Sequence, residues 1–341
     1  MTETSGEFVA SALPPREKQG KGRKRWWVWL LFFLGGLCLL SLPLFTCMAS
    51  WAALTGSAVP LGGGAPRVYR EPVRGPAFGP EVAVVVLEGP IVSARGSTTR
   101  PVIAADRVVD LLHTLNTSSR VRAVVLAINS PGGGVAPSER IYHALKGMDK
   151  PVVAYFQDVA ASGGYYIAMG AEEIVAHPST LTGSIGVIAV FPHAERLLDK
   201  VGIGVVVVKS GPHKDMGSIF REMTPEERQH IQDIVDAMYL NFVEVVAQGR
   251  NLPLQEVKTL ADGRIYSGEQ ALELGLVDHL GFEEKAVERA AALAGLTREP
   301  KVVRYYPGYS SWALLFQSQQ PRLPWNLQLQ LTPGLYYLWL P

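Results

Sequence analysis

Short runs of β-branched and other apolar residues alternate with helically spaced segments over the middle of the chain. Nearly continuous apolar runs, which are typical of strands buried on both faces, stand at 82–89, 121–129, 151–156, 173–177 and 204–210. Segments with helical spacing lie between them, at 103–115, 135–147, 163–170 and 193–200. Strands that alternate with helices in this way predict parallel βαβ units, and therefore an α/β fold.

The later part of the chain has a mainly helical pattern. Thr224 directly before Pro225 predicts the capped start of a long helix. The segments "YSGEQALELG" and "EEKAVERAAALAG" predict two shorter helices. The expected fold is therefore an α/β domain with a helical C-terminal part.

A long uncharged segment precedes this domain. No charged residue stands between Arg25 and Arg67, and the apolar run 26–54 exceeds the roughly 20 residues that a helix needs to cross a bilayer. Tryptophans lie at both ends of the run and the basic cluster "KGRKR" precedes it, which predicts a cytoplasmic N-terminus. The alternative is a signal peptide cleaved near "MASWA", although the run is long and aromatic for that purpose. We expect a retained single-pass anchor in the inner cell membrane, with the folded domain outside the cytoplasm.

These patterns divide the chain into five parts. They are a basic cytoplasmic tail (1–25), a transmembrane anchor (26–54), a Gly/Pro-rich linker (55–80), a folded domain (81–297) and an apolar C-terminal tail (298–341). From Pro307 onward the tail is aromatic, Gln-rich and nearly uncharged. The sequence leaves open whether this tail enters a groove of the domain, lies on the membrane or packs on a neighbouring copy.

The composition excludes several kinds of chemistry. Cys38 and Cys47 both lie in the predicted anchor, so the exported part has no disulfide and no cysteine nucleophile. The acidic residues are scattered, and no cluster of His, Asp and Glu has the spacing of metal ligands. No nucleotide-binding motif is present, and a net charge of +1 gives no general attraction to nucleic acid. We therefore expect no metal, no cofactor and no nucleic-acid partner.

Two glycine-rich loops follow predicted strands, at the positions where parallel α/β folds collect their chemistry. In "NSPGGGV", Gly132 and Gly133 precede a helix, and their free N–H groups suit either an oxyanion site or an ordinary tight turn. In "DVAASGGYYIA", Ser162 precedes two glycines and a helix. That position suits a nucleophile, and the alternative is a serine that caps the helix.

A serine nucleophile needs a base, and the sequence offers two kinds. One is a histidine oriented by Asp158 or Asp215; the histidines in suitable positions are His177, His193 and His213. The other is Lys214, in the loop "GPHKDMGS". A lysine serves as a base only where burial lowers its pKa, and a solvated loop lysine is the plain alternative. Position along the chain does not decide between the two.

At these residues the sequence resembles the signal-peptide-peptidase-A family of membrane-anchored serine proteases, in its short single-copy form. The resemblance runs from about Val82 to Leu296. Its motifs are, in order, "NSPGG", "ASGGYYIA", "PSTLTGSIGV", "KSGPHKDMGS" with "REMTPEER", and "ADGRIYSGEQALELGLVD". It implies a Clp/crotonase-like spiral of ββα units, assembled into a homo-oligomeric ring whose active sites are shared between neighbouring subunits.

The resemblance also implies a role for each candidate residue. Ser162 would be the nucleophile and Lys214 the general base, with Ser184 orienting the lysine amine. The oxyanion hole would combine the N–H of Gly163 with that of Gly132 or Gly133. Asp215 is expected to point away from the lysine, and His177 to have no catalytic role.

The family implies substrates that are apolar, above all signal peptides left in the membrane after export. Residues 81–297 would then be a serine protease domain. One alternative is a non-catalytic oligomeric scaffold of the same fold, and another is a related protease that acts on membrane-protein partners. An acyl-CoA enzyme fits poorly, because an exported domain has no access to coenzyme A.

Overall fold

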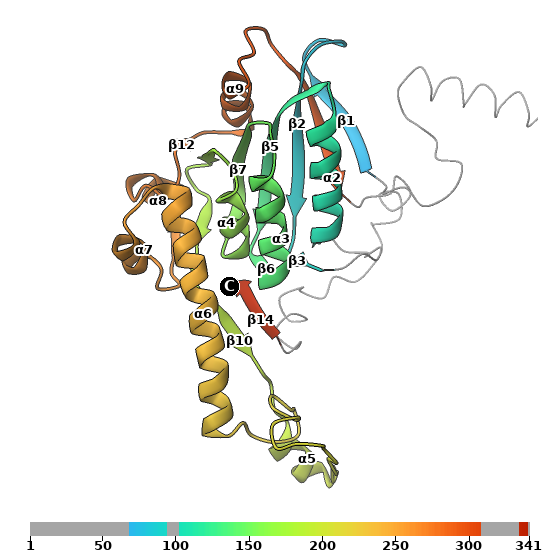
Figure 1. Ribbon diagram of the computed structural model, residues 1–341, viewed down its shortest axis with the longest axis vertical. Coiled ribbons are helices and arrows are strands. Elements are labelled where there is room, and N and C mark those ends of the chain that lie inside the picture. Colours follow the sequence, from blue (N-terminus) through green and yellow to red (C-terminus); the bar gives the residue numbers. More distant parts are fainter. Residues whose placement is uncertain (1–67, 94–101, 308–333, 340–341) are drawn as a thin grey trace, which may run out of the picture. The chain divides into compact units, whose positions relative to one another are not determined.

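The computed structural model describes residues 68–93, 102–307 and 334–339 (Figure 1). The predicted basic tail 1–25 and the predicted anchor 26–54 lie outside these ranges. Within them, no helix combines the length and the apolar character needed to span a membrane.

A mostly parallel sheet forms the centre of the described domain (Figure 1). Its inner strands pair in parallel in the order β2 (Glu81–Glu88), β5 (Val121–Ser130), β7 (Val152–Ala161) and β8 (Glu173–Ala176). They match the predicted runs from 82 to 177 and are largely buried, as strands covered on both faces are. The predicted α/β fold is confirmed.

Shorter strands extend this sheet at both edges. They are β13 (Lys301–Pro307) and β1 (Val68–Arg74) beside β2, β12 (His279–Leu280) beside β8, and β9 (Leu181–Gly183) with β11 (Ile265–Ser267) beside the end of β7. Strand β1 falls within the segment 55–80 that the sequence predicted as a linker, and β13 falls within the predicted tail 298–341. Both segments thus contribute to the sheet.

Helices cover the two faces of the sheet with separate apolar clusters. One cluster holds α2 (Ala105–Thr117), α3 (Val135–Lys146) and α4 (Gly163–Ala168), and the other holds α9 (Glu283–Leu293). Successive residues of β2 alternate between them, with Ala83 and Val85 in the first and Val84 in the second. The sheet is therefore the middle layer of three.

The remaining helices follow in the second half of the chain. They are α5 (Glu195–Val201), α6 (Pro225–Arg250), α7 (Leu254–Leu260) and α8 (Gly268–Glu273). The predicted cap of α6 is confirmed: the Glu227 N–H donates to Thr224 Oγ1 at 3.2 Å, and the Thr224 N–H donates to the Glu227 carboxylate at 3.0 Å.

A second, smaller sheet crosses the carboxyl ends of the inner strands. Its order is β10 (Ile188–Val190), β14 (Gly334–Leu338), β6 (Gly132–Gly134), β3 (Ile91–Val92) and β4 (Ile103–Ala104). Strand β14 comes from the C-terminal tail, whose placement was left open between three alternatives. It lies antiparallel between β6, which contains the first glycine loop, and β10 (Figure 1).

The strand predicted at 204–210 is wrong. This segment has no regular secondary structure, and Val206 and Val208 are about nine-tenths exposed, at 90% and 93%. Val205 and Val207 are about half as exposed, so the side chains still alternate as they do in an edge strand. A β-branched run predicts an extended backbone, but a strand also needs a partner for its N–H and C=O groups. The described part of this chain provides none.

The C-terminal end of α6 is joined to the main sheet by a partly buried ion pair. The Arg250 guanidinium donates to both carboxylate oxygens of Asp278, at 2.7 and 2.8 Å, and its Nε donates to the Gly275 carbonyl at 2.9 Å. The same carboxylate accepts the N–H of Ile174, the second residue of β8, at 2.8 Å. Removal of the guanidinium would leave this carboxylate without its counter-charge.

We predict that Arg250→Ala lowers the free energy of unfolding by about 3 kcal/mol or more, because the Asp278 charge would lose its partner. The measurement is urea unfolding of the full chain, followed by far-UV circular dichroism. Arg264→Ala is the matched control, since Arg264 is paired with Asp262 at an exposed site. Equal unfolding midpoints for the two variants would contradict this role of Arg250.

Candidate active site

Ser162 stands at the turn between β7 and α4 in a strained backbone conformation. Its φ is 52° and its ψ is −116°, a region that L-residues rarely adopt. The turn is held by a hydrogen bond from the Ser162 N–H to the Gly183 carbonyl at 2.8 Å, and by one from the Tyr166 N–H to the Ser162 carbonyl at 2.8 Å. The backbone on both sides of the serine is thus fixed.

The hydroxyl of Ser162 is buried and unpaired. The residue is 1% exposed, and its Oγ has no hydrogen-bond partner in the described part of the chain. The side chain does not cap α4, so the helix-cap alternative is wrong. Burying a polar atom without a hydrogen-bond partner costs free energy, and such atoms in native proteins often have a catalytic role.

Both candidate serines, Ser162 and Ser184, have a positive φ, which is uncommon for residues other than glycine. Among the described residues these values occur at Ser162, Ser184 and Asn251. Asn251 ends α6 in a left-handed cap, which asparagine tolerates. Ser162 and Ser184 directly follow the paired residues Ala161 and Gly183 of the neighbouring strands β7 and β9. The structure therefore brings Ser184, 7% exposed, to the strand position beside Ser162.

The loop of Gly132 and Gly133 and the loop of Gly163 lie so close together that residues with a β-carbon would not fit at Gly132 and Gly163. A β-carbon on Gly132 would lie 2.6 Å from the Gly163 nitrogen, and one on Gly163 would lie 3.1 Å from the Gly133 nitrogen. Gly132 also has a φ of 99°, and its N–H donates to Ser130 Oγ at 3.1 Å. This leaves the N–H groups of Gly133 and Gly163 as the better pair for an oxyanion.

Lys214 lies in a different part of the chain from Ser162. Figure 1 shows α5 and the turns that follow it beside the N-terminal end of α6, away from α4. Lys214 is exposed, and no described residue forms a hydrogen bond or ion pair with its ammonium. Within one chain, therefore, Lys214 does not reach the Ser162 hydroxyl.

The loop that carries Lys214 is held by charged side chains around it. Lys209 Nζ donates to Asp215 at 2.7 Å, and Arg221 donates to both Asp215 and Glu227 at 2.6 to 3.0 Å. Hydrogen bonds from Arg221 and then from Lys209 hold the pKa of the Asp215 carboxyl well below its usual range. Hydrogen bonds from Arg221 and from the Thr224 N–H lower the pKa of Glu227 to about 2.

The Asp215 carboxylate therefore faces Lys209 and Arg221 rather than Lys214. This orientation away from Lys214 agrees with the expectation above, whereas the pairing of Asp215 with Arg221 was not predicted. The sequence contains Arg221 in the motif "REMTPEER", three residues before Thr224, but this spacing does not identify the carboxylates with which it pairs.

None of the candidate histidines pairs with Ser162. His177 Nδ1 accepts the Ser179 N–H at 3.1 Å, and its ring packs on the edge of Phe282 at 5.1 Å. His193 and His213 lie near Glu222 and Glu227, at 3.6 and 3.9 Å. The described residues also contain no cluster of three or more His, Cys, Asp or Glu that could hold a metal ion.

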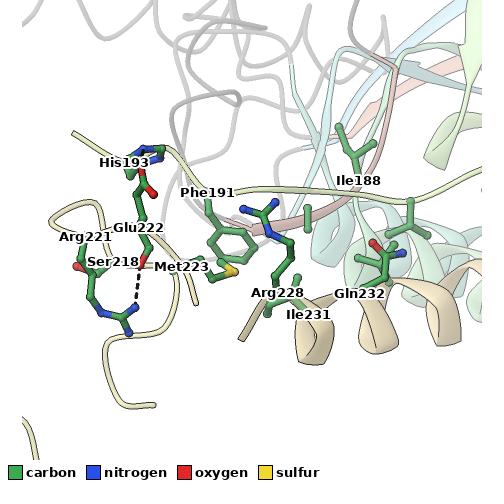
Figure 2. Close-up of a pocket in the computed structure, with 14 residues that line it drawn as sticks. Ile188, Phe191, His193, Ser218, Arg221, Glu222, Met223, Arg228, Ile231 and Gln232 are labelled. Carbon is green, nitrogen blue, oxygen red and sulfur yellow. Dashed lines mark hydrogen bonds and ion pairs between the residues drawn. The ribbon is translucent and has the colours of Figure 1, made fainter. Parts of the chain in front are cut away.

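Two adjoining cavities lie along α6. The first, of about 560 Å³, is lined by Phe191, Arg221, Glu222 and residues of β10 and α6, and Figure 2 shows these side chains around it. The second, of about 510 Å³, includes Ser184, Leu338 and Trp339. Val187, Ile188, Gln232 and Val235 line both cavities. A continuous trough thus leads from the surroundings of Ser184 toward the base of the Lys214 loop.

Comparison with known proteins identifies relatives of this domain. Residues 144–297 match peptidase family S49, and residues 90–181 match Clp protease. A Synechocystis sp. protein named "Putative protease" is 53% identical over 176 residues, which are 51% of this chain and 64% of that protein. A Methanocaldococcus jannaschii protein, also named "Putative protease", is 40% identical over 199 residues, 58% of this chain and 64% of that protein.

An Enterococcus faecium protein named "Putative signal peptide peptidase SppA" is 43% identical over 197 residues, 57% of this chain and 57% of that protein. The chain thus spans less than two thirds of the length of these relatives. The matched residues include Ser162, Ser184 and Lys214 in the S49 region. The resemblance inferred from the motifs is confirmed: residues 144–297 of this chain are similar to peptidase family S49, residues 90–181 are similar to Clp protease, and the chain is similar to a protein named as a signal peptide peptidase SppA.

Proposed function

We propose that the protein is a serine endopeptidase in which Ser162 is the nucleophile and Lys214 the general base. The observation that carries this proposal is the buried, strained and unpaired hydroxyl of Ser162 beside the glycines of two loops. The relatives named as proteases and the S49 match support the same reaction class.

The proposed reaction gives each of these groups one role. Ser162 Oγ attacks the carbonyl carbon of the substrate, and its proton passes to the amine of Lys214. The Gly133 and Gly163 N–H groups donate to the developing oxyanion, and each such donor is typically worth about 10²–10³ in rate. The lysine returns the proton to the leaving amine, and water then hydrolyses the ester. Ser184 orients the lysine amine.

A second copy of the chain supplies the lysine. Two observations support this: Lys214 is exposed on a segment away from α4, and Ser162 Oγ has no partner among the described residues of its own chain. The same segment exposes Leu197, Val201, Val206 and Val208, which is a large apolar surface for a monomer. The unpaired valine run has the alternation of an edge strand and would gain backbone partners from a neighbour. Each active site of the homo-oligomeric ring is then made by two copies.

The substrates are apolar peptides in or near a membrane, above all remnant signal peptides. The apolar run 26–54 supports this, because an anchor would hold the catalytic domain at the bilayer surface outside the cytoplasm. The SppA name of the Enterococcus relative points the same way. Proteolysis of other membrane-protein partners requires the same site and is the nearest variant of this function.

We expect Ser162→Ala and Lys214→Ala each to lower kcat/KM at least about 10³-fold, because both groups act in the same proton transfer. The assay is hydrolysis of a fluorogenic apolar peptide by the full-length protein in detergent micelles. His177→Ala is the control and is expected to stay active. An active Lys214→Ala together with an inactive His177→Ala would make histidine the base, and an inactive wild type would favour the scaffold alternative.

Sharing of the site between copies predicts complementation. When the Ser162→Ala and Lys214→Ala chains are co-expressed in equal amounts, about one quarter of the sites receive an intact serine and an intact lysine from different chains. The mixture should therefore recover about a quarter of the wild-type activity. A mixture as inactive as the separate variants would show that both residues must come from one chain.

The charged network around the lysine loop gives a further prediction. We expect Arg221→Ala to lower kcat/KM at least about tenfold at neutral pH, because the Asp215 and Glu227 carboxylates would lose the cation that holds them together. Arg196→Ala is the matched control, since Arg196 is highly exposed and contacts only Glu222 among the described residues.

The lowered pKa values determine how this network depends on pH. Its stabilising effect is complete above the usual carboxyl pKa, near pH 4 to 5. It is lost only as the pH falls toward the folded-state pKa of Glu227, about 2. The ratio of wild-type to Arg221→Ala activity should therefore stay constant between about pH 5 and pH 9. A ratio that changes tenfold in this range would contradict the assignment.

A further inference from the structure

A fully buried hydroxyl, that of Ser130, holds the loop that carries the candidate oxyanion glycines. Ser130 is the last residue of β5 and is 0% exposed. Its Oγ accepts the N–H of Gly132, two residues further along the chain, at 3.1 Å. Serine hydroxyls that accept a backbone N–H in this way close tight turns. The Gly132 N–H is therefore already bonded, and the next N–H group of the loop is that of Gly133.

This turn sets the direction of the Gly133 N–H through the peptide group that precedes it. The ring of Pro131 fixes its φ at about −65°. Gly132 has a φ of 99°, a conformation that glycine adopts without strain. With the Gly132 N–H held by the Ser130 hydroxyl, little freedom is left in the turn. Because a peptide group is planar, the orientation of the one between Gly132 and Gly133 determines where the Gly133 N–H points.

Ser130 also lies directly against the helix that begins after the candidate nucleophile. A β-carbon on Gly164, in the first turn of α4, would lie 2.9 Å from the Ser130 carbonyl oxygen and 3.4 Å from the Ser130 β-carbon. In the ladder between β5 and β7, Ser130 is paired with Ala160, two residues before Ser162. Ser130 thus contacts the glycine loop through its side chain, and it packs on the turn of Ser162 through its backbone.

Other buried side chains hold the strand that leads to Ser162, and they do so without contact to the glycine loop. The register of β7 against β5 shifts just before Ala160, so β7 has a bulge there. Asn129 Oδ1 accepts the Val159 N–H across this bulge at 3.3 Å. Thr180, also 0% exposed, donates through Oγ1 to the Phe156 carbonyl at the start of the bulge, at 3.1 Å. The Thr180 hydroxyl therefore fixes the strand, whereas the Ser130 hydroxyl fixes the loop.

We propose that Ser130 is a positioning residue, whose hydroxyl orients the Gly132 peptide so that the Gly133 N–H donates to the oxyanion. The inference rests on the proposed protease function. Ser130 acts only through the glycine loop, since its hydroxyl is bonded to Gly132. Without that hydroxyl, the buried Gly132 N–H loses this acceptor, and a buried donor without an acceptor is costly. The Gly132 peptide then turns toward another acceptor, and the Gly133 N–H turns away from the oxyanion.

The test compares wild type with Ser130→Ala in the full-length protein, using the fluorogenic apolar peptide and a peptide aldehyde of the same sequence as inhibitor. Ser162 Oγ adds to the aldehyde carbon and its proton passes to Lys214, which leaves a tetrahedral oxyanion like that of the transition state. We expect kcat to fall at least about tenfold while KM changes less than about twofold, because the donor acts only on the oxyanion. The Ki of the aldehyde should rise by the factor by which kcat/KM falls.

Thr180→Val is the matched control, because it removes another fully buried hydroxyl, one that is bonded to β7 and not to the glycine loop. Both variants should lower the midpoint of urea unfolding, since each loses a buried hydrogen bond. Only Ser130→Ala should change the ratio of the aldehyde Ki to the substrate KM. Ser130→Cys gives the same test if Ser130→Ala does not fold, since a thiol nearly fills the same space and is a weak acceptor.

Two results would overturn this role of Ser130 while leaving the protease function intact. One is an aldehyde Ki in Ser130→Ala, or in the folded Ser130→Cys, equal to that of wild type. The other is an equal rise of Ki in Ser130→Ala and Thr180→Val, which would make the effect one of general stability. A wild type that cuts no peptide and does not bind the aldehyde would overturn the protease function together with this role.

Discussion

The close approach of two glycine loops around a strained serine is the constraint on which the rest of the site depends. Gly132 and Gly163 stand so near each other that a β-carbon on either would meet the other loop's backbone or Ser138 within 3 Å. This contact exists because β5 and β7 are neighbours in a parallel sheet, so the loops at their carboxyl ends meet. The three-layer core fixes the positions of the strands, and the strands fix the positions of the loops at their ends. These loops bring the N–H groups of Gly133 and Gly163 close to Ser162.

The proposed catalytic groups are divided between the strand ends of the sheet and an exposed segment of the domain. Ser162, Ser184 and the oxyanion glycines lie at ends of strands in the sheet. Lys214 lies on an exposed segment, fixed locally by Arg221 between Asp215 and Glu227. In the proposed mechanism this division makes turnover depend on assembly, because no described residue of a single chain places a base beside the Ser162 hydroxyl.

Much of the fold was predictable because local patterns and the final structure agree. The runs at 82–89, 121–129, 151–156 and 173–177 are covered on both faces and form strands, and Thr224 caps α6 as its sequence context predicts. The prediction for the run at 204–210 failed because no partner strand lies beside it in the described part of the chain, which no local pattern reveals. Ser162 and the glycines were recognisable from their position after strands. The placement of Tyr337 was not, because it depends on pairing between residues about 200 positions apart.

The most direct test of the central claim is covalent labelling of the full-length protein with a fluorophosphonate, which reacts with activated serines. Peptide mass spectrometry then identifies the labelled residue in wild type and in Lys214→Ala. The account predicts a label on Ser162 in wild type and a large loss of labelling in Lys214→Ala, because the lysine removes the proton of the attacking hydroxyl. A label on another serine, or equal labelling of Ser162 in both proteins, would contradict it.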